Sequence, residues 1–164
     1  MSANDVRTHK QITRRGAVAV EFALILPLFF GLLMGVLELG RALEVSHTLT
    51  TAAREGGRLG SMDRQGILLP GQSGNQKIEA DIRAFLNAAG LPGSTAVVKV
   101  VDPDDETVTF DIDDPDNELE LFRVIVRLDF DNGISYIPPT FMQGKQLEGS
   151  VVFRNGRTSF ASGG

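Results

Sequence analysis

The chain has 164 residues, of which 42% are hydrophobic, and it contains no cysteine. This length can hold one membrane segment and one small domain, and the lack of cysteine excludes disulfides, thiolate metal sites, a lipoprotein anchor and a thiol nucleophile. Residues 1–16 carry four basic side chains and one acidic, whereas residues 17–164 carry 12 basic and 20 acidic. The acidic remainder argues against nucleic acid as a partner, because phosphate binding needs clustered lysine and arginine.

The first element is a cytoplasmic leader, residues 1–16, of which we predict the polar stretch 1–13 to be disordered. An apolar run follows at residues 17–37, in which Glu21 is the only charged residue. A helix of that length spans about 31 Å, close to the roughly 30 Å of a hydrocarbon core. The run also exceeds the roughly 7–15 apolar residues of a secretory signal peptide. We therefore predict a transmembrane anchor at 17–37, with the basic N-terminus in the cytoplasm.

Glu21 is a carboxylate inside this apolar run, where a charge costs roughly 2.5–3.5 kcal/mol at the bilayer centre and usually has a partner. Cleavage after Gly16 would give Ala17 a free amino group four residues before Glu21. The new terminus of the same or a neighbouring subunit would then pair with the carboxylate. Alternatively, Glu21 lies shallow enough to reach the cytoplasmic surface, and spacing alone leaves both interpretations open.

Two glycines, Gly31 and Gly35, have the small-xxx-small spacing that lets helix backbones approach each other in a membrane. Glycine is frequent in membrane helices, so the same spacing also fits background composition. Glu38 and Arg41 end the apolar run three residues apart, which allows an ion pair on one helix face.

Small and apolar residues recur at three- and four-residue spacing beyond Arg41, which predicts that the helix continues. We predict one helix over residues 17–59, half in lipid and half packed on a domain, ending near the glycines at 56–60. His47 is interpreted as a surface residue, because no second histidine or carboxylate pair accompanies it.

Residues 60–164 are predicted to form an α+β domain outside the membrane. A glycine-rich loop precedes a helix at Gln76–Ala89, with Asn75 as N-cap and Gly90 as C-cap. The pattern then changes to period two, which predicts an antiparallel sheet of about four strands, covered on one side by the helices. The predicted strands are Thr95–Val101, Glu106–Ile112, Leu119–Phe130 and Gln146–Arg154. The chain is expected to fray from about residue 156.

Acidic residues are concentrated between Asp102 and Glu120. Oxygen ligands at alternate positions suit Ca²⁺, and the weak candidates are Asp111, Asp113 and Asp116. The full EF-hand spacing is missing, and Asp, Pro and Asn at strand ends also form solvated turns, which is the competing interpretation. Phosphate loops, nucleophile elbows and zinc spacings are absent from the sequence, so we expect neither an enzyme nor a cofactor.

The stretch from residue 14 to residue 60 resembles the TadE-type minor pilins, or pseudopilins, of bacterial tight-adherence (Flp) systems, within the type IV pilin superfamily. The basic pair and glycine followed by AVAVEF resemble a prepilin processing site. The matching residues are Gly16, Glu21, Phe22, Pro27, Glu38, Gly40, Arg41 and the block Ala52, Ala53, Arg54, Glu55 and Gly56.

The resemblance implies cleavage between Gly16 and Ala17 by a prepilin peptidase, N-methylation of the new terminus, and a role in pilus assembly and adhesion. Glu21 and Phe22 would then register the subunit against a neighbour. The implied partners are the peptidase, major and minor pilins, the inner-membrane assembly platform and the lipid bilayer. The implied location is the bacterial inner membrane, with the C-terminal domain periplasmic, followed by incorporation in the extracellular pilus.

Two other functions remain open on the residues alone. The first is an unprocessed single-pass membrane protein whose outer domain binds a ligand or partner. The second is a membrane-tethered enzyme, for which no site stands out. The N-terminal mass of the native protein separates the first of these from a processed pilin.

Overall fold

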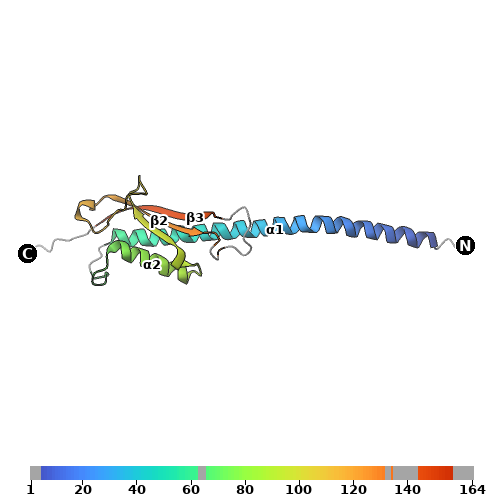
Figure 1. The fold of residues 1–164 in the computed structure, drawn as a ribbon, viewed down its shortest axis with the longest axis horizontal. Helices are drawn as coiled ribbons and strands as arrows, with labels where there is room; N and C mark the ends of the chain where they lie inside the picture. The colour runs from blue at the N-terminus through green and yellow to red at the C-terminus, as the bar shows by residue number, and fades with distance from the viewer. Residues whose placement is uncertain (1–4, 63–65, 132–133, 135–143, 157–164) are drawn as a thin grey trace, which may run out of the picture. The chain divides into compact units, whose positions relative to one another are not determined.

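The structure (Figure 1) is a computed structural model that describes residues 5–62, 66–131, 134 and 144–156, with side chains from Gly16 onward. The chain divides into two compact units, residues 1–40 and residues 41–164. A single helix, α1 (Asp5–Ser61), passes through the boundary between them. The expected disordered leader is therefore wrong from Asp5 onward, where the chain lacks a glycine or proline that would stop a helix before Gly16.

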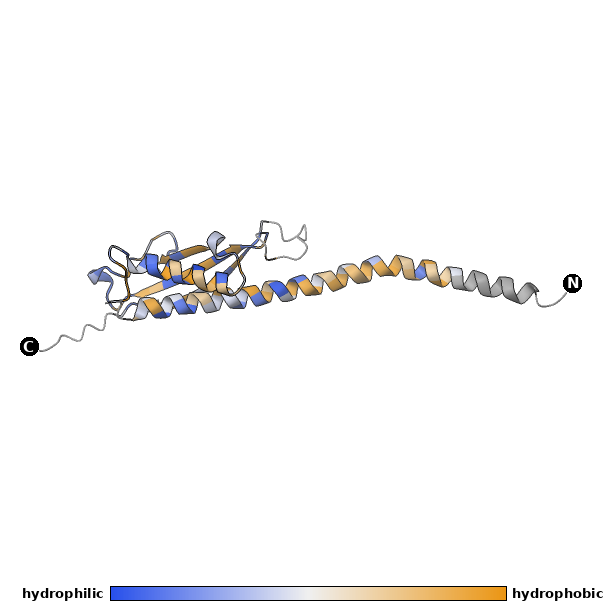
Figure 2. Ribbon diagram, turned by 90° about the horizontal axis from the view of Figure 1, so that it is seen from below, coloured by the Kyte–Doolittle hydropathy of each residue, from blue (hydrophilic) through white to orange (hydrophobic). Residues whose placement is uncertain are grey.

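The first unit is helical wherever it is described, and every side chain from Gly16 to Leu37 is exposed. Figure 2 shows this stretch as an almost unbroken apolar ribbon. Pro27 lies inside α1, and the helix continues through it. The expected long N-terminal helix is confirmed.

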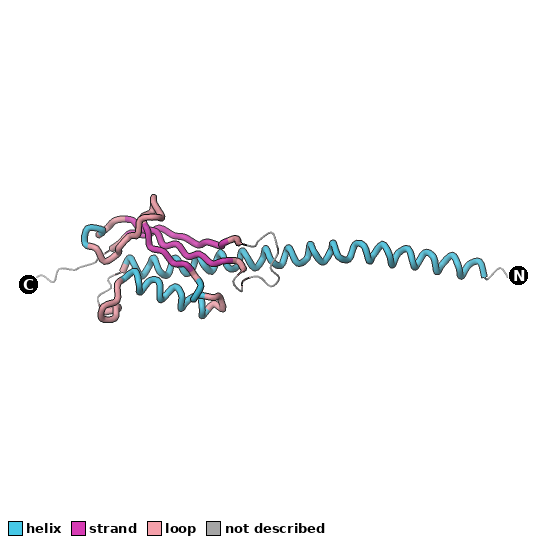
Figure 3. Tube along the Cα trace, viewed as in Figure 1, coloured by secondary structure: helices cyan, strands magenta, loops and turns pink. Residues whose placement is uncertain are grey.

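The second unit packs two helices on one face of an antiparallel sheet with three strands in the described residues. The helices are the part of α1 from Arg41 onward and α2 (Gly74–Ala88), and the sheet has the order β1-β2-β3. The strands are β1 (Val97–Val101), β2 (Leu121–Asp129) and β3 (Gln146–Arg154), and Figure 3 shows them lying together over the helices. Two short 3₁₀ helices, η1 (Gly93–Thr95) and η2 (Pro115–Asn117), lie in the connections.

The central strand β2 has the period-two pattern expected of a strand with one buried face. Its buried side chains on the helix-facing side are Phe122, Val124, Val126 and Leu128. They join the helices in one core, where Phe122 stacks near Phe110 and Phe153. The α+β class and the antiparallel sheet are therefore confirmed.

The predicted strand at Glu106–Ile112 is wrong, because only an isolated bridge between Val101 and Thr109 forms there. The side chain of Asn75 takes the place of a neighbouring strand. Its Nδ2 donates to the carbonyl of Phe110 at 2.7 Å, and its Oδ1 accepts from the Ile112 N–H at 3.3 Å. The segment is drawn toward the start of α2 instead of continuing along β1.

Helix α2 begins two residues earlier than predicted, because Ser73 and not Asn75 is its N-cap. Ser73 and Gln76 form a reciprocal capping box, in which each side chain accepts a backbone N–H of the other residue. At the other end the C-cap is Ala89, and Gly90 follows it with φ +76°. The Leu91 N–H donates to the Leu86 carbonyl at 2.9 Å, which is the Schellman arrangement that glycine after a C-cap permits.

Glycines let α1 lie directly against the rest of the domain. A Cβ at Gly149 in β3 would stand 2.3 Å from the backbone nitrogen of Thr50. A Cβ at Gly57 would stand 2.1 Å from the ring of Phe153, and one at Gly56 would stand 2.5 Å from Ile82. The second half of α1 is therefore held by contacts so close that only glycine, which has no Cβ, fits at these positions.

Candidate functional site

The exposed stretch of α1 from Gly16 to Leu37 is the candidate functional site. It is long and apolar enough to cross a membrane, and none of its most apolar window is buried within the chain. Apolar side chains cover all sides of the helix, so no polar face indicates contact with water. The stretch therefore has the properties of a helix that is covered by lipid or by other helices.

Gly16, Ala17, Glu21 and Phe22 lie on the first turns of this stretch. A Cβ added at Gly16 would meet nothing within 4 Å, and Phe22 is exposed. Glu21 is exposed and makes no hydrogen bond or ion pair with the residues that the structure describes. It stands one turn after Ala17, on the same side of the helix. In the uncut chain the Ala17 nitrogen is a peptide amide, so it offers the carboxylate no charge.

Gly31 and Gly35 also have open space around them. A Cβ at either residue would meet no atom within 4 Å. The small-xxx-small pair thus forms part of the uncovered surface, and no described residue of this chain packs on it.

The residues that end the apolar run have different surroundings. Glu38 is buried, with 6% of its side chain exposed, whereas Gly40 is exposed and has nothing near the position of a Cβ. Arg41 forms an ion pair with Glu44 at 3.0 Å, and its Nε donates to the Ile134 carbonyl at 3.4 Å. Arg41 therefore holds the backbone of Ile134 against α1, near the point where burial of the helix begins.

The block at residues 52–56 divides into packing residues and surface residues. Ala52, Ala53 and Gly56 are buried against the core, while Arg54 and Glu55 face outward. Glu55 pairs with Arg58 at 3.1 Å on the helix surface. The small residues of this block thus act in folding the domain, which distinguishes them from Gly31 and Gly35.

Two of the three acidic candidates for Ca²⁺, Asp111 and Asp113, accept hydrogen bonds from backbone N–H groups. Asp113 Oδ2 accepts the Gly74 N–H at the start of α2, at 2.5 Å, and Asp111 Oδ1 accepts the Asp113 N–H at 3.0 Å. The Asp116 N–H donates to Asp114. Within the described ranges no group of three or more acidic, histidine or cysteine side chains is placed to hold a metal ion.

Asn155 is a structural residue that sequence reasoning missed. Its side chain is 1% exposed, and Nδ2 donates to the carbonyls of Ile112 and Asn117, both at 3.0 Å. Its backbone bonds to Leu119 and Glu120, and Leu119 has a left-handed φ of +66°. An asparagine before a glycine at the end of a strand was the available signal, but the same pattern is usual in a frayed tail.

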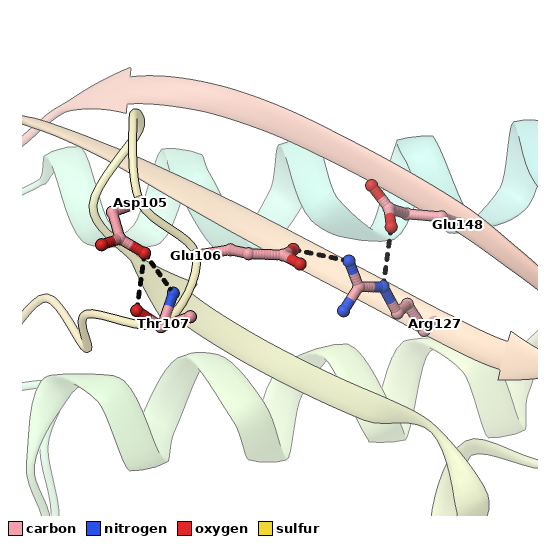
Figure 4. A network of polar contacts seen from close by, with 5 residues as sticks. All are labelled: Asp105, Glu106, Thr107, Arg127 and Glu148. Atoms are coloured by element: carbon pink, nitrogen blue, oxygen red, sulfur yellow. Dashed lines mark hydrogen bonds and ion pairs between the residues drawn. The ribbon is translucent and has the colours of Figure 1, made fainter.

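A charged network on the outer sheet face was also missed. Arg127 donates to Glu106 at 2.6 Å and to Glu148 at 2.7 Å (Figure 4). The hydrogen bond and charge of Arg127 hold the pKa of Glu106 below its ordinary value, and the two carboxylates raise the pKa of Arg127. Nearby, hydrogen bonds from Thr107 lower the pKa of Asp105.

Comparison with known proteins bears on the helix and not on the sheet. Residues 16–58 match the protein family described as TadE-like protein. No curated protein and no solved structure matches the chain. The match begins at Gly16 and ends at Arg58, so it contains both the exposed stretch and the buried part of α1. The resemblance read from the sequence is thereby confirmed: the chain carries a TadE-like segment at residues 16–58.

Proposed function

We propose that this protein is a minor pilin or pseudopilin of a tight-adherence (Flp) pilus, made as a precursor and cleaved after Gly16 by a prepilin peptidase. The observation that carries the proposal is the uncovered apolar helix at residues 16–37, which lies within the TadE-like match. That match indicates a protein associated with tight-adherence pili. The finer role, in assembly of the pilus and in adhesion, is our inference.

Local chemistry supports a cut at Gly16. Glycine in a helix interior costs roughly 1 kcal/mol relative to alanine, so the helix opens more readily there for a protease. The open space around Gly16 allows an enzyme to approach the backbone closely. Cleavage places a positive amine at the new helix N-terminus, where the helix dipole disfavours it, and the Glu21 carboxylate offsets that charge. The same pairing with a neighbour's amine would fix the register between subunits.

The membrane is the proposed residence of this helix before assembly. The basic residues before Gly16 favour a cytoplasmic N-terminus, which places the C-terminal domain in the periplasm. The helix would leave the inner membrane only when major or other minor pilins cover its apolar surface on the assembly platform.

The N-terminal mass of the native protein from piliated cells tests the processing step. We expect a chain that begins at Ala17, and we expect Gly16→Leu to retain the leader. Gly35→Leu is the matched control, since it adds the same side chain to an equally open helix position and should be cut normally. An intact leader in piliated cells would instead support the unprocessed single-pass membrane protein.

Glu21 tests the registration step separately. We expect Glu21→Gln, which keeps the shape and removes the charge, to be processed normally but to enter pili poorly. Glu44→Gln removes a carboxylate from the exposed surface of the same helix and should assemble normally. Normal piliation and adhesion of the Glu21 variant would refute the pairing role.

A further inference from the structure

The outer face of the sheet carries a small patch of alternating apolar and cationic side chains at one end. Leu121 stands opposite Arg154, and Arg123 stands opposite Val152, so the four side chains point to the same face. Leu121 and Val152 are 45% and 46% exposed. We call these four residues the arginine patch.

The two arginines of the patch differ from Arg127, which lies four residues beyond Arg123 on β2. Arg127 is paired with two carboxylates, Glu106 and Glu148. Arg123 and Arg154 make no ion pair or side-chain hydrogen bond within the part of the chain that the structure describes, although Arg123 is close enough to act on Glu106 through space. The patch therefore presents positive charge on an otherwise acidic chain.

Acidic loops adjoin the same end of the sheet. Val101 pairs with Arg123, so the connection at 102–120, which leaves β1 after Val101 and enters β2 at Leu121, begins and ends beside the patch. Residues 102–120 contain ten acidic residues and no lysine or arginine. Asp116 and Glu118 are exposed, and their carboxylates make no hydrogen bond or ion pair with described residues. Asn155 and the Asx turns hold this loop in place, so its charge is presented in a fixed position.

We propose that this end of the domain binds a second copy of the chain across a two-fold axis, with the acidic loop at 111–120 of each copy against Arg123 and Arg154 of the other. One surface then carries both halves of a complementary contact, as an interface between identical subunits requires. Leu121 and Val152 supply apolar contact between the charged groups. The contact belongs to the domain alone, so it is independent of processing at Gly16.

The absence of cysteine allows a direct test with the full chain in detergent micelles. We expect Val152→Cys to form an intermolecular disulfide on mild oxidation. Val97→Cys is the matched control, because Val97 lies on the same sheet face, opposite Arg127, and is 44% exposed. We expect it to cross-link at least fivefold less. Equal cross-linking at both positions would mean that the membrane helices alone bring the chains together, and would overturn the proposal.

Charge reversal then identifies the contact. In the Val152→Cys background, R123E/R154E and D116K/E118K should each reduce cross-linking about tenfold. Each exposed ion pair is weak, but every substitution occurs twice in a two-fold dimer, so the losses add up. A mixture of the two variants should restore it, since both contacts of the mixed dimer are again attractive. Concentrated salt should weaken the unmodified contact. Unreduced cross-linking after charge reversal would contradict the two-fold contact, and so would a mixture of the two variants that does not cross-link.

Discussion

The two halves of α1 are one helix in two kinds of surroundings. From Gly16 to Leu37 every side chain is exposed, whereas Ala42, Val45, Leu49, Ala52 and Ala53 are buried in the domain core. Glycines occur in both halves. Those of the first half have nothing near them, and those at 56, 57 and 60 would strike other side chains if they carried a Cβ.

This difference divides the glycines of the TadE-like match into two groups. Packing within the described chain explains why one group is small, and it does not explain the other. Gly56 and Gly57 are small because Ile82 and Phe153 fill the space beside them. Gly31 and Gly35 have no such neighbour among the described residues, so contacts within the described chain do not explain them. Folding of the domain thus uses the second half of the helix, whereas the proposed assembly would use the first, and substitutions can test each half separately.

The largest expected effect comes from Gly149→Ala. The new Cβ would stand 2.3 Å from the Thr50 nitrogen and 2.4 Å from the Leu49 carbonyl carbon, and helix backbone cannot move aside as a side chain can. We expect a loss of at least about 3 kcal/mol in the free energy of unfolding of the full chain, measured by urea denaturation in detergent.

Ser150→Ala is the control for this change, since Ser150 is the exposed neighbour in the same strand. It should alter the free energy by less than about 0.5 kcal/mol. An unchanged midpoint for Gly149→Ala would contradict the direct packing of β3 on the second half of α1.

Asn155→Ala should have the next largest effect, although it lies outside the TadE-like match. The change leaves the buried carbonyls of Ile112 and Asn117 without the side-chain donor, which costs about 2–3 kcal/mol. Gln146→Ala removes an exposed side-chain bond to Asp129 at the other end of β3 and serves as control. Equal midpoints for the two variants would show that Asn155 does not hold the loop before β2.

The sequence predicted what depends on local periodicity. The long helix, α2, β2 and β3 follow from spacings of 3.6 and 2, and the uncovered apolar run at 17–37 follows from composition. What it missed depends on contacts between distant residues. Asn75 was assigned to the α2 cap because it precedes the apolar pattern, yet it bonds to Phe110 and Ile112 and so interrupts the expected strand.

The site was predictable to a similar degree. Gly16, Glu21, Gly31 and Gly35 lie on the exposed helix where the spacing placed them, because a helix fixes relative positions along a face. The different roles of Gly35 and Gly56 were not predictable, since only the folded sheet shows which glycine has a neighbour. The ion pairs of Arg127 were not predictable either, because its partners Glu106 and Glu148 lie 21 residues away in either direction.

One glycine-to-alanine substitution in each half of α1 tests whether only the second half is packed by this chain, and we expect smaller changes in the free energy of unfolding than those above. Gly57→Ala pushes the Phe153 ring, a side chain that can shift, so overpacking is partly offset by the roughly 1 kcal/mol of helix propensity that alanine adds. We expect a net loss of about 1 kcal/mol in the domain. Gly35→Ala should leave the free energy of unfolding of the domain unchanged, and a comparable loss there would mean that the first half is also packed by this chain.

The smallest expected effect is the pH dependence that the ion pairs of Arg127 give to the stability of the domain. The pKa of Glu106 is lowered in the folded chain, so the unfolded chain binds more protons in this range and stability rises with pH. The contribution is complete above the ordinary carboxyl pKa and is lost as the pH falls through the lowered pKa of Glu106. Urea midpoints at several pH values should therefore fall less steeply in Arg127→Gln than in the parent chain. Thr107→Val is the control variant. It removes a hydrogen bond that lowers the pKa of the neighbouring Asp105, and it leaves the ion pairs of Arg127 intact. If the Arg127 and parent profiles were parallel, the network would add no pH dependence.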